Sequence, residues 1–228
     1  MHPMKKIVFL LMLFLPLAYS CGSASKLNYV LTEQDAADAI RQLLQIGTRE
    51  GSVGNAFSKQ NIINTVFPEN VAKVLNTLNN LGLSQDLDRF TTTLSSAATT
   101  SVERSVPVFA NAITGMRLGD AINLVRSGSP TAATDFLKAN TQTQLRSTLT
   151  PVMAAALDEY KLNAMWADLI KPIKNTGVGS RLNLDLNNLM AIAVTDAMFR
   201  KMAEKETEIR NNASARTTPL LQRVFGSR

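Results

Sequence analysis

The sequence predicts an all-α protein: a single irregular or orthogonal multi-helix domain behind a signal peptide. Apolar residues recur three or four positions apart through most of the chain, which is the spacing of one helix face. Proline and glycine interrupt this spacing at intervals typical of helix ends. Strand-like alternation is confined to Leu182 and Leu184. We therefore divide the chain into a signal peptide (1–20), a tether (21–30) and an all-helical domain (31–228).

The first residues are those of a secretory signal. Lys5 and Lys6 precede an unbroken apolar run at residues 7–15, which is too short to cross a membrane. The segment 18–22, Ala-Tyr-Ser-Cys-Gly, resembles a bacterial lipobox, in which the cysteine is lipidated and becomes the first residue of the mature chain. The alternative is cleavage by ordinary signal peptidase, which would leave Cys21 as a free thiol. Several acyl chains on Cys21 would anchor the protein stably. Because no aspartate follows Cys21, we expect an outer-membrane lipoprotein that faces the periplasm.

The first half of the domain divides into several helices. Thr32 to Asp35 resembles a capping box, and the apolar spacing behind it continues to Gly47. We expect a short helix around residues 62–66, a third from Pro68 to a stop at Gly82, and a long helical stretch over residues 84–116. Pro107 lies inside that stretch, and because proline removes a backbone donor we expect a kink or a break there.

The second half opens with a short helix at residues 118–125, closed by Gly128. Ser129-Pro130 is predicted to cap and start a helix over residues 131–138, and Thr150-Pro151 to start the next one. Residues 171–185 read as a loop. Residues 186–202 are apolar on almost every face, which is typical of a central buried helix. Glu206 then faces Arg210 at i,i+4 spacing, and residues 218–226 form a last short helix.

Composition excludes much chemistry. The single histidine, His2, leaves with the signal, and the single cysteine, Cys21, is the lipidation residue. The mature domain therefore has no His/Cys metal cluster and no imidazole base, so we expect no cofactor and no enzymatic activity. Loss of Lys5 and Lys6 lowers the net charge from +6 to +4. So mild an excess on an exported protein does not favour nucleic acid as a partner.

Three segments resemble an uncharacterised bacterial family, DUF4197. Residues 129–138 (SPTAATDFLK) are similar to its "TAATxYLK" segment, residues 109–116 (FANAITGM) to its middle, and residues 209–226 (IRNNASARTTPLLQRVFG) to its end. The resemblance covers about residues 31–226 and departs from the family pattern at Ser129-Pro130 and Pro219. It implies an exported all-helical domain, often lipid-anchored, and it implies no activity.

Two groups of residues are candidates for anion or ligand binding. Thr131, Thr134 and Asp135 lie at a predicted helix start, where free N–H groups favour a carboxylate or a phosphate. The alternative is that Ser129 and Thr131 only cap the helix while Asp135 satisfies its first turn or an arginine. The second group is a possible anion clamp near the C-terminus, made of Arg210, Arg216, Thr217 and Arg223.

The clamp has a structural alternative, in which its arginines tie the tail to the domain through Asp135, Glu103 or Asp196. Asp196 interrupts the most apolar helix and needs a partner if buried, for which a tail arginine is the first choice. Glu103-Arg104 is expected to be ordinary surface or a buried pair. The domain methionines and Trp166 are expected in the core, with a Met-rich groove as the alternative. These residues are Met116, Met153, Met165, Met190, Met198 and Met202.

Three functions remain open. The leading hypothesis is a non-enzymatic, lipid-anchored module that binds another envelope component. A second is a carrier or sensor of a small anionic amphiphile, held by Arg216 or Arg223. A third is a carboxylate-based hydrolase, which needs two acids facing each other across a cleft, and the sequence shows only scattered acids.

Overall fold

Every regular element that the structure describes is a helix, as the sequence predicts. The structure is a computed structural model that describes residues 29–78, 84–171 and 184–226. The chain divides into two compact units, Met1–Val30 and Leu31–Arg228. The signal, Cys21, Gly82 and most of the expected 171–185 loop lie outside the described residues.

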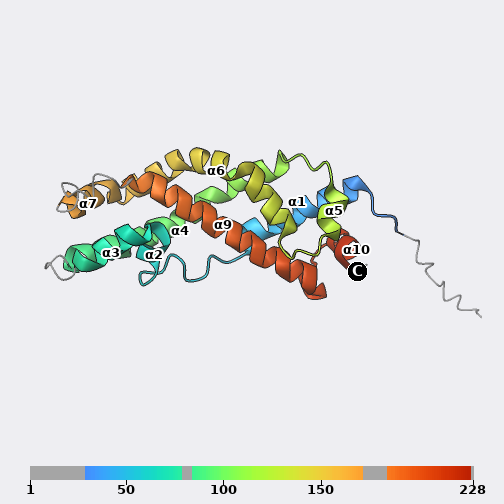
Figure 1. Ribbon diagram of the computed structural model, residues 1–228, viewed down its shortest axis with the longest axis horizontal. Coiled ribbons are helices and arrows are strands. Elements are labelled where there is room, and N and C mark those ends of the chain that lie inside the picture. The colour runs from blue at the N-terminus through green and yellow to red at the C-terminus, as the bar shows by residue number, and fades with distance from the viewer. Residues whose placement is uncertain (1–28, 79–83, 172–183, 227–228) are drawn as a thin grey trace, which may run out of the picture. The chain divides into compact units, whose positions relative to one another are not determined.

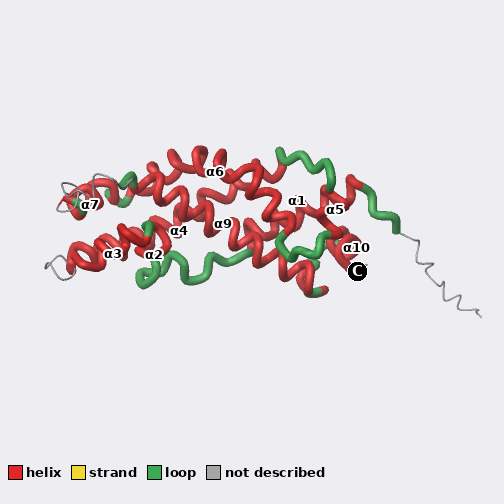
Figure 2. The backbone as a smooth tube through the Cα atoms, in the orientation of Figure 1, coloured by secondary structure: helices red, strands yellow, loops and turns green. Residues whose placement is uncertain are grey.

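The second unit is built from helices of very different lengths (Figures 1 and 2). They are α1 (Glu33–Glu50), α2 (Ile62–Val66), α3 (Glu69–Leu78), α4 (Ser84–Thr114), α5 (Ala121–Arg126), α6 (Ala132–Glu159), α7 (Leu162–Leu169), α9 (Leu186–Asn211), the 3₁₀ turn η3 (Ala213–Ala215) and α10 (Pro219–Gly226). None of the helices within these ranges has a stretch long and apolar enough to cross a membrane.

Helix α9 is the central helix, which confirms the prediction from its apolar residues. It packs most extensively against α6 and α1, and also contacts α4, α2, α7 and α10 (Figure 1). Because neighbours cover several of its faces, Met190, Val194, Met198 and Met202 are fully buried. Met116 and Met153 are also buried, while Met165 is half-buried.

Helix α1 starts and packs as its sequence indicates. The Thr32 side chain accepts a hydrogen bond from the backbone N–H of Asp35 at 3.1 Å, which confirms the Thr32 half of the predicted capping box. Further along, Gly47 and Gly51 let α1 approach α9 closely. A Cβ on Gly47 would lie 3.0 Å from Cα of Met202, and one on Gly51 would lie 2.5 Å from Cγ of Lys201.

The expected helix start at Pro151 is wrong, and Pro107 does not break its helix. Pro107 lies inside the continuous helix α4, and Pro151 lies inside α6. Both prolines are exposed, whereas Phe109, Ile113, Met153 and Leu157 on the inner faces of the same helices are fully buried. Each proline removes one ladder bond, and it does so on the solvent side, so packing of the inner face keeps each helix continuous.

An aromatic cluster surrounds the single tryptophan. The Trp166 ring stacks on Phe67 at 4.9 Å and on Phe90 at 5.5 Å between centroids. Its indole N–H donates to the carbonyl of Leu184 at 2.7 Å, which satisfies a polar group in a side chain that is only 4% exposed. Trp166 therefore belongs to the core and ties α7 to the residues before α9.

Candidate functional site

A buried ion pair occupies the last turns of α9. Arg210 Nε donates to Oε1 of Glu206 at 2.8 Å, and the two side chains are 2% and 0% exposed. The i,i+4 spacing predicts this contact, and the structure confirms it. Burial distinguishes the pair from surface pairs, because each charge has lost its water and needs a complete set of protein partners.

The remaining partners of Glu206 are at the start of α6. Its carboxylate accepts hydrogen bonds from the backbone N–H of Ala133 at 2.9 Å, and from the N–H and hydroxyl of Thr134 at 2.8 and 2.7 Å. These are the amides for which the sequence suggested a ligand anion. The protein's own carboxylate occupies that position, and an external anion would have to displace it.

The other predicted residues at this helix start take different roles. Thr131 Oγ1 donates to Oδ2 of Asp135 at 2.8 Å on the exposed side. Helix α6 begins at Ala132, with Thr131 as its N-cap residue but with no side-chain cap bond. Ser129 Oγ accepts a hydrogen bond from the N–H of Thr131 at 3.3 Å, as a capping residue would. The expected helix start at Pro130 is wrong, because α6 begins at Ala132 and the carboxylate of Glu206 from α9 accepts from its first amides.

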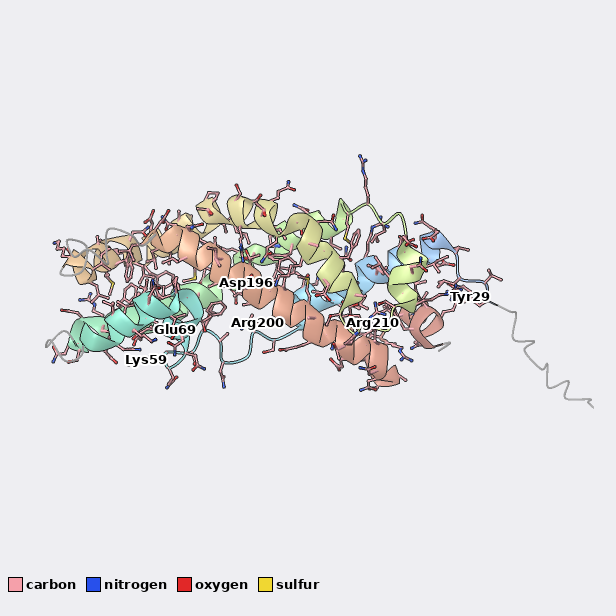
Figure 3. The ribbon with its side chains drawn as sticks, viewed as in Figure 1. Tyr29, Lys59, Glu69, Asp196, Arg200 and Arg210 are labelled. Carbon is pink, nitrogen blue, oxygen red and sulfur yellow. The ribbon has the colours of Figure 1, made fainter. Side chains whose placement is uncertain are left out.

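Arg210 and Arg216 tie the C-terminal segment to the domain. Arg210 also donates to the carbonyls of Val125 and Leu124, both at 3.0 Å, and its guanidinium lies 5.1 Å from the centre of the Phe225 ring. Figure 3 labels Arg210 on α9 close to α5 and α10. Arg216 donates to the carbonyls of Ile209 and Arg210, both at 2.9 Å. The partners expected for these two arginines were wrong, since backbone carbonyls and Glu206 replace Asp135, Glu103 and Asp196.

Within the described residues, the predicted clamp residues do not line the pockets found at α2, α3, α4 and α6. Thr217 and Arg223 are exposed, and Arg223 is itself engaged by another group of the protein. Of the residues proposed from sequence, the structure joins Thr134 to Arg210 through Glu206. It does not gather Thr131, Asp135, Thr217 and Arg223 around them.

Asp196 pairs with α6 and not with the tail. Arg146 Nη2 donates to Oδ1 of Asp196 at 2.9 Å, and the Gln142 amide donates to the same oxygen at 3.0 Å. The side chains of Arg146 and Asp196 are 32% and 41% exposed, and Figure 3 labels Asp196 midway along α9. The expectation of a tail arginine was wrong because the neighbouring helix supplies a closer one.

Glu103 is exposed, and Arg104 pairs with a residue far along the chain. Arg104 Nη2 donates to Oε2 of Glu159 at 2.7 Å, which joins α4 to the end of α6. This hydrogen bond raises the pKa of Arg104 and lowers the pKa of Glu159. The pair is a surface bridge between two helices.

A groove with a volume of about 420 Å³ lies between α4 and α6. The side formed by the end of α4 and the two residues after it is mostly small and apolar, and it consists of Val108, Asn111, Ala112, Gly115 and Met116. The side from α6 consists of Thr141, Gln144, Leu145 and Thr148. Hydroxyl, amide and apolar groups line the groove, and none of these lining side chains carries a charge.

Ion pairs involve residues on either side of the segment 108–116 that lines this groove. One turn before Val108, Arg104 bridges to Glu159. At the other end of the segment, Arg41 pairs with Asp38 at 3.1 Å and donates to the carbonyl of Met116 at 3.2 Å. Sequence reasoning missed the groove. The available signal was the absence of any charged residue between Ser105 and Met116, but only the packing of α4 on α6 gives that segment a partner wall.

The fold and the groove define an all-α domain with an uncharged surface groove and, within the described residues, no group of three His, Cys, Asp or Glu side chains placed to hold a metal. The chain belongs to the family described as "Protein of unknown function (DUF4197)", whose model matches residues 30–226. No curated protein matches the chain, and no solved structure does.

Proposed function

We propose that this protein is a lipid-anchored binding module of the periplasm, held in the outer membrane through Cys21, and that it binds another envelope component through the α4–α6 groove. The observation that carries the proposal is the uncharged groove of about 420 Å³. Interface centres are depleted of charged residues and rich in apolar contacts, and this composition also characterises the groove lining.

The groove favours the binding module over the two alternatives. A carrier of an anionic amphiphile needs a cation at the head group, whereas the lining has none and Arg216 is engaged with backbone carbonyls. A carboxylate-based hydrolase needs two facing acids, and the groove lining contains no carboxylate.

Two glycine variants test whether the groove is the binding surface. Gly115 borders the groove, and a Cβ there meets only the carbonyls of Asn111 at 3.5 Å and Ala112 at 3.9 Å; at Gly128, outside the groove, a Cβ meets nothing within 4 Å. Both positions therefore have room at Cβ. Gly115→Trp should fill the groove, while Gly128→Trp is the matched control.

Cells that produce the full chain would be treated with formaldehyde, and crosslinked products would be detected by immunoblot. We expect products that disappear with Gly115→Trp and persist with Gly128→Trp. A product pattern unchanged by Gly115→Trp would contradict the assignment of the groove.

The lipid anchor is tested separately. Cys21→Ser should move the protein from the membrane fraction to the soluble fraction, and unchanged membrane association would contradict lipidation.

A further inference from the structure

We infer that the occupant of the α4–α6 groove is an α-helix of another protein, one that presents an uncharged face of small and apolar side chains. This inference rests on the proposed function and deepens it by naming the kind of partner. Three features of the groove support this occupant: its charge, the spacing of its walls, and the backbone groups near it.

Charge decides which chemistry can enter. No lining residue can neutralise a charge in the groove. Two neighbouring arginines are already paired, Arg104 with Glu159 and Arg41 with Asp38. A phosphate, a carboxylate or an ammonium group would lose water there without gaining a counter-ion, which is unfavourable. The neutral face also continues outwards along α6, because Arg146 is the only charged residue between Ala139 and Leu157 and it turns to Asp196 on α9.

The walls have the spacing into which a helix packs. Along α4 the lining residues recur at 108, 111, 112 and 115, and along α6 at 141, 144, 145 and 148. Both series follow the i+3 and i+4 rows of a helix surface, and the ridges and grooves of such rows interlock when helices pack. Ala112, Gly115 and Thr141 are small, so a partner backbone can approach closely, in the helix-in-groove mode of recognition.

Two backbone carbonyls close in sequence to the lining residues lack a donor in the helical ladder. Pro107 and Pro151 are exposed and have no N–H, so they cannot donate to the carbonyls of Glu103 and Ser147 in the helical ladder. Ser147 is the neighbour of the lining residue Thr148. Together with the Asn111 and Gln144 amides, these carbonyls suit a partner helix whose rim carries hydroxyl or amide donors.

Site-specific photocrosslinking in the intact envelope tests the inference. p-Benzoylphenylalanine would replace Asn111, Gly115, Gln144 or Thr148, one at a time, in the full chain. Thr114 and Thr143 are the matched controls, because both are exposed on the same helices and neither lines the groove. Trp166 fluorescence would verify that each variant is folded, and mass spectrometry would identify the crosslinked residues.

The spacing of the crosslinks separates a helix from an extended segment. Positions 111 and 115 lie about one helical turn apart, or roughly 5.4 Å. A bound helix should therefore be crosslinked at residues three or four apart, whereas an extended strand, rising about 3.3 Å per residue, should be crosslinked at residues about two apart. Crosslinks three or four residues apart within one partner protein support the inference. Crosslinks two apart overturn the helix and leave the binding module standing.

Three other outcomes would overturn the binding module along with the helix: adducts only to lipid, adducts only to a second copy of this chain, and yields no higher than those of Thr114 and Thr143.

A variant that adds a charge to the groove provides the second test. Gln144→Glu keeps the shape of the side chain but adds a negative charge to the groove, and it should reduce the yield from position 111 by about tenfold or more. Thr143→Glu adds the same charge outside the groove and should leave that yield unchanged. Equal yields in the two variants would contradict the neutral-face inference.

Discussion

The carboxylate of Glu206 receives the guanidinium of Arg210 on one side and the first amides of α6 on the other, and all of these groups are buried. The Glu206 carboxylate acts only as an acceptor in these contacts, which also include the hydroxyl of Thr134. The contact unites the end of α9 with α6, while Arg210 extends it to α5 and to Phe225 of α10. It is the principal polar link between the C-terminal segment and the rest of the domain.

Glu206→Gln should destabilise the protein strongly. The variant has the same shape, but its NH₂ group must face the N–H donors of Arg210 or α6. It also leaves a buried guanidinium without a counter-ion. Removing one partner of a buried pair costs about 3–5 kcal/mol, which urea unfolding followed by circular dichroism would measure.

The matched control is Glu69→Gln, which removes the exposed i,i+4 partner of Lys73. Exposed pairs contribute about 0–1 kcal/mol, so this variant should unfold at nearly the wild-type urea concentration. Equal losses for the two variants would show that burial of Glu206 has no energetic consequence.

Gly51→Ala should also destabilise, through the contact between α1 and α9. The added Cβ would lie 2.5 Å from Cγ of Lys201, 2.6 Å from the carbonyl oxygen of Lys201 and 2.7 Å from that of Gly47. Two of these atoms are backbone and cannot move independently, so we expect a loss of about 1–3 kcal/mol, visible as a lower Tm. Gly128→Ala, which meets nothing within 4 Å, should change stability by less than about 1 kcal/mol.

Lys201 should make stability depend on alkaline pH. Its side chain is nearly buried, and its ammonium donates one long bond of 3.4 Å to the carbonyl of Arg49. Burial lowers the pKa of Lys201, so between the folded pKa and the ordinary lysine value the unfolded chain binds more protons. The contribution of Lys201 to stability therefore rises with pH in that window.

Lys201→Met removes this charge and should raise Tm near neutral pH. The difference in Tm between variant and wild type should shrink as pH increases through the window, and differential scanning fluorimetry on Trp166 would measure it. A difference that stays constant with pH would mean that the ammonium of Lys201 is not desolvated in the fold.

The bridge between Arg104 and Glu159 can be tested by titration. The hydrogen bond from Arg104 lowers the pKa of Glu159, so the contribution of this bridge to stability is present above the ordinary glutamate pKa and is lost as pH falls through the folded value. Arg104→Gln should return the pKa of Glu159 towards its ordinary value, as NMR of the side-chain carboxyl would report. An unchanged pKa would indicate that the two side chains do not stay together in solution.

Local sequence patterns predicted those elements whose interactions are local. The Thr32 cap and the Glu206–Arg210 contact each join residues three or four positions apart. The apolar pattern of α9 also has a short period, so local spacing was enough to predict all three features. The break expected at Pro107 and the helix start expected at Pro151 were wrong because proline disfavours a helix locally, whereas the packing of the buried faces of α4 and α6 keeps each helix continuous across its proline.

By itself, the sequence determined the helical class, the family and the residues that could pair within one helix, because the period of apolar residues and the i,i+4 spacing are properties of the chain. The tertiary structure decided which charged residues meet, as Glu206 does with the start of α6 and Arg146 with Asp196, pairs separated by 50 or more positions. It also decided that an uncharged stretch of α4 faces an uncharged stretch of α6 to form a groove. Such contacts depend on how the helices pack, since any polar residue has many possible partners until the apolar faces fix their neighbours.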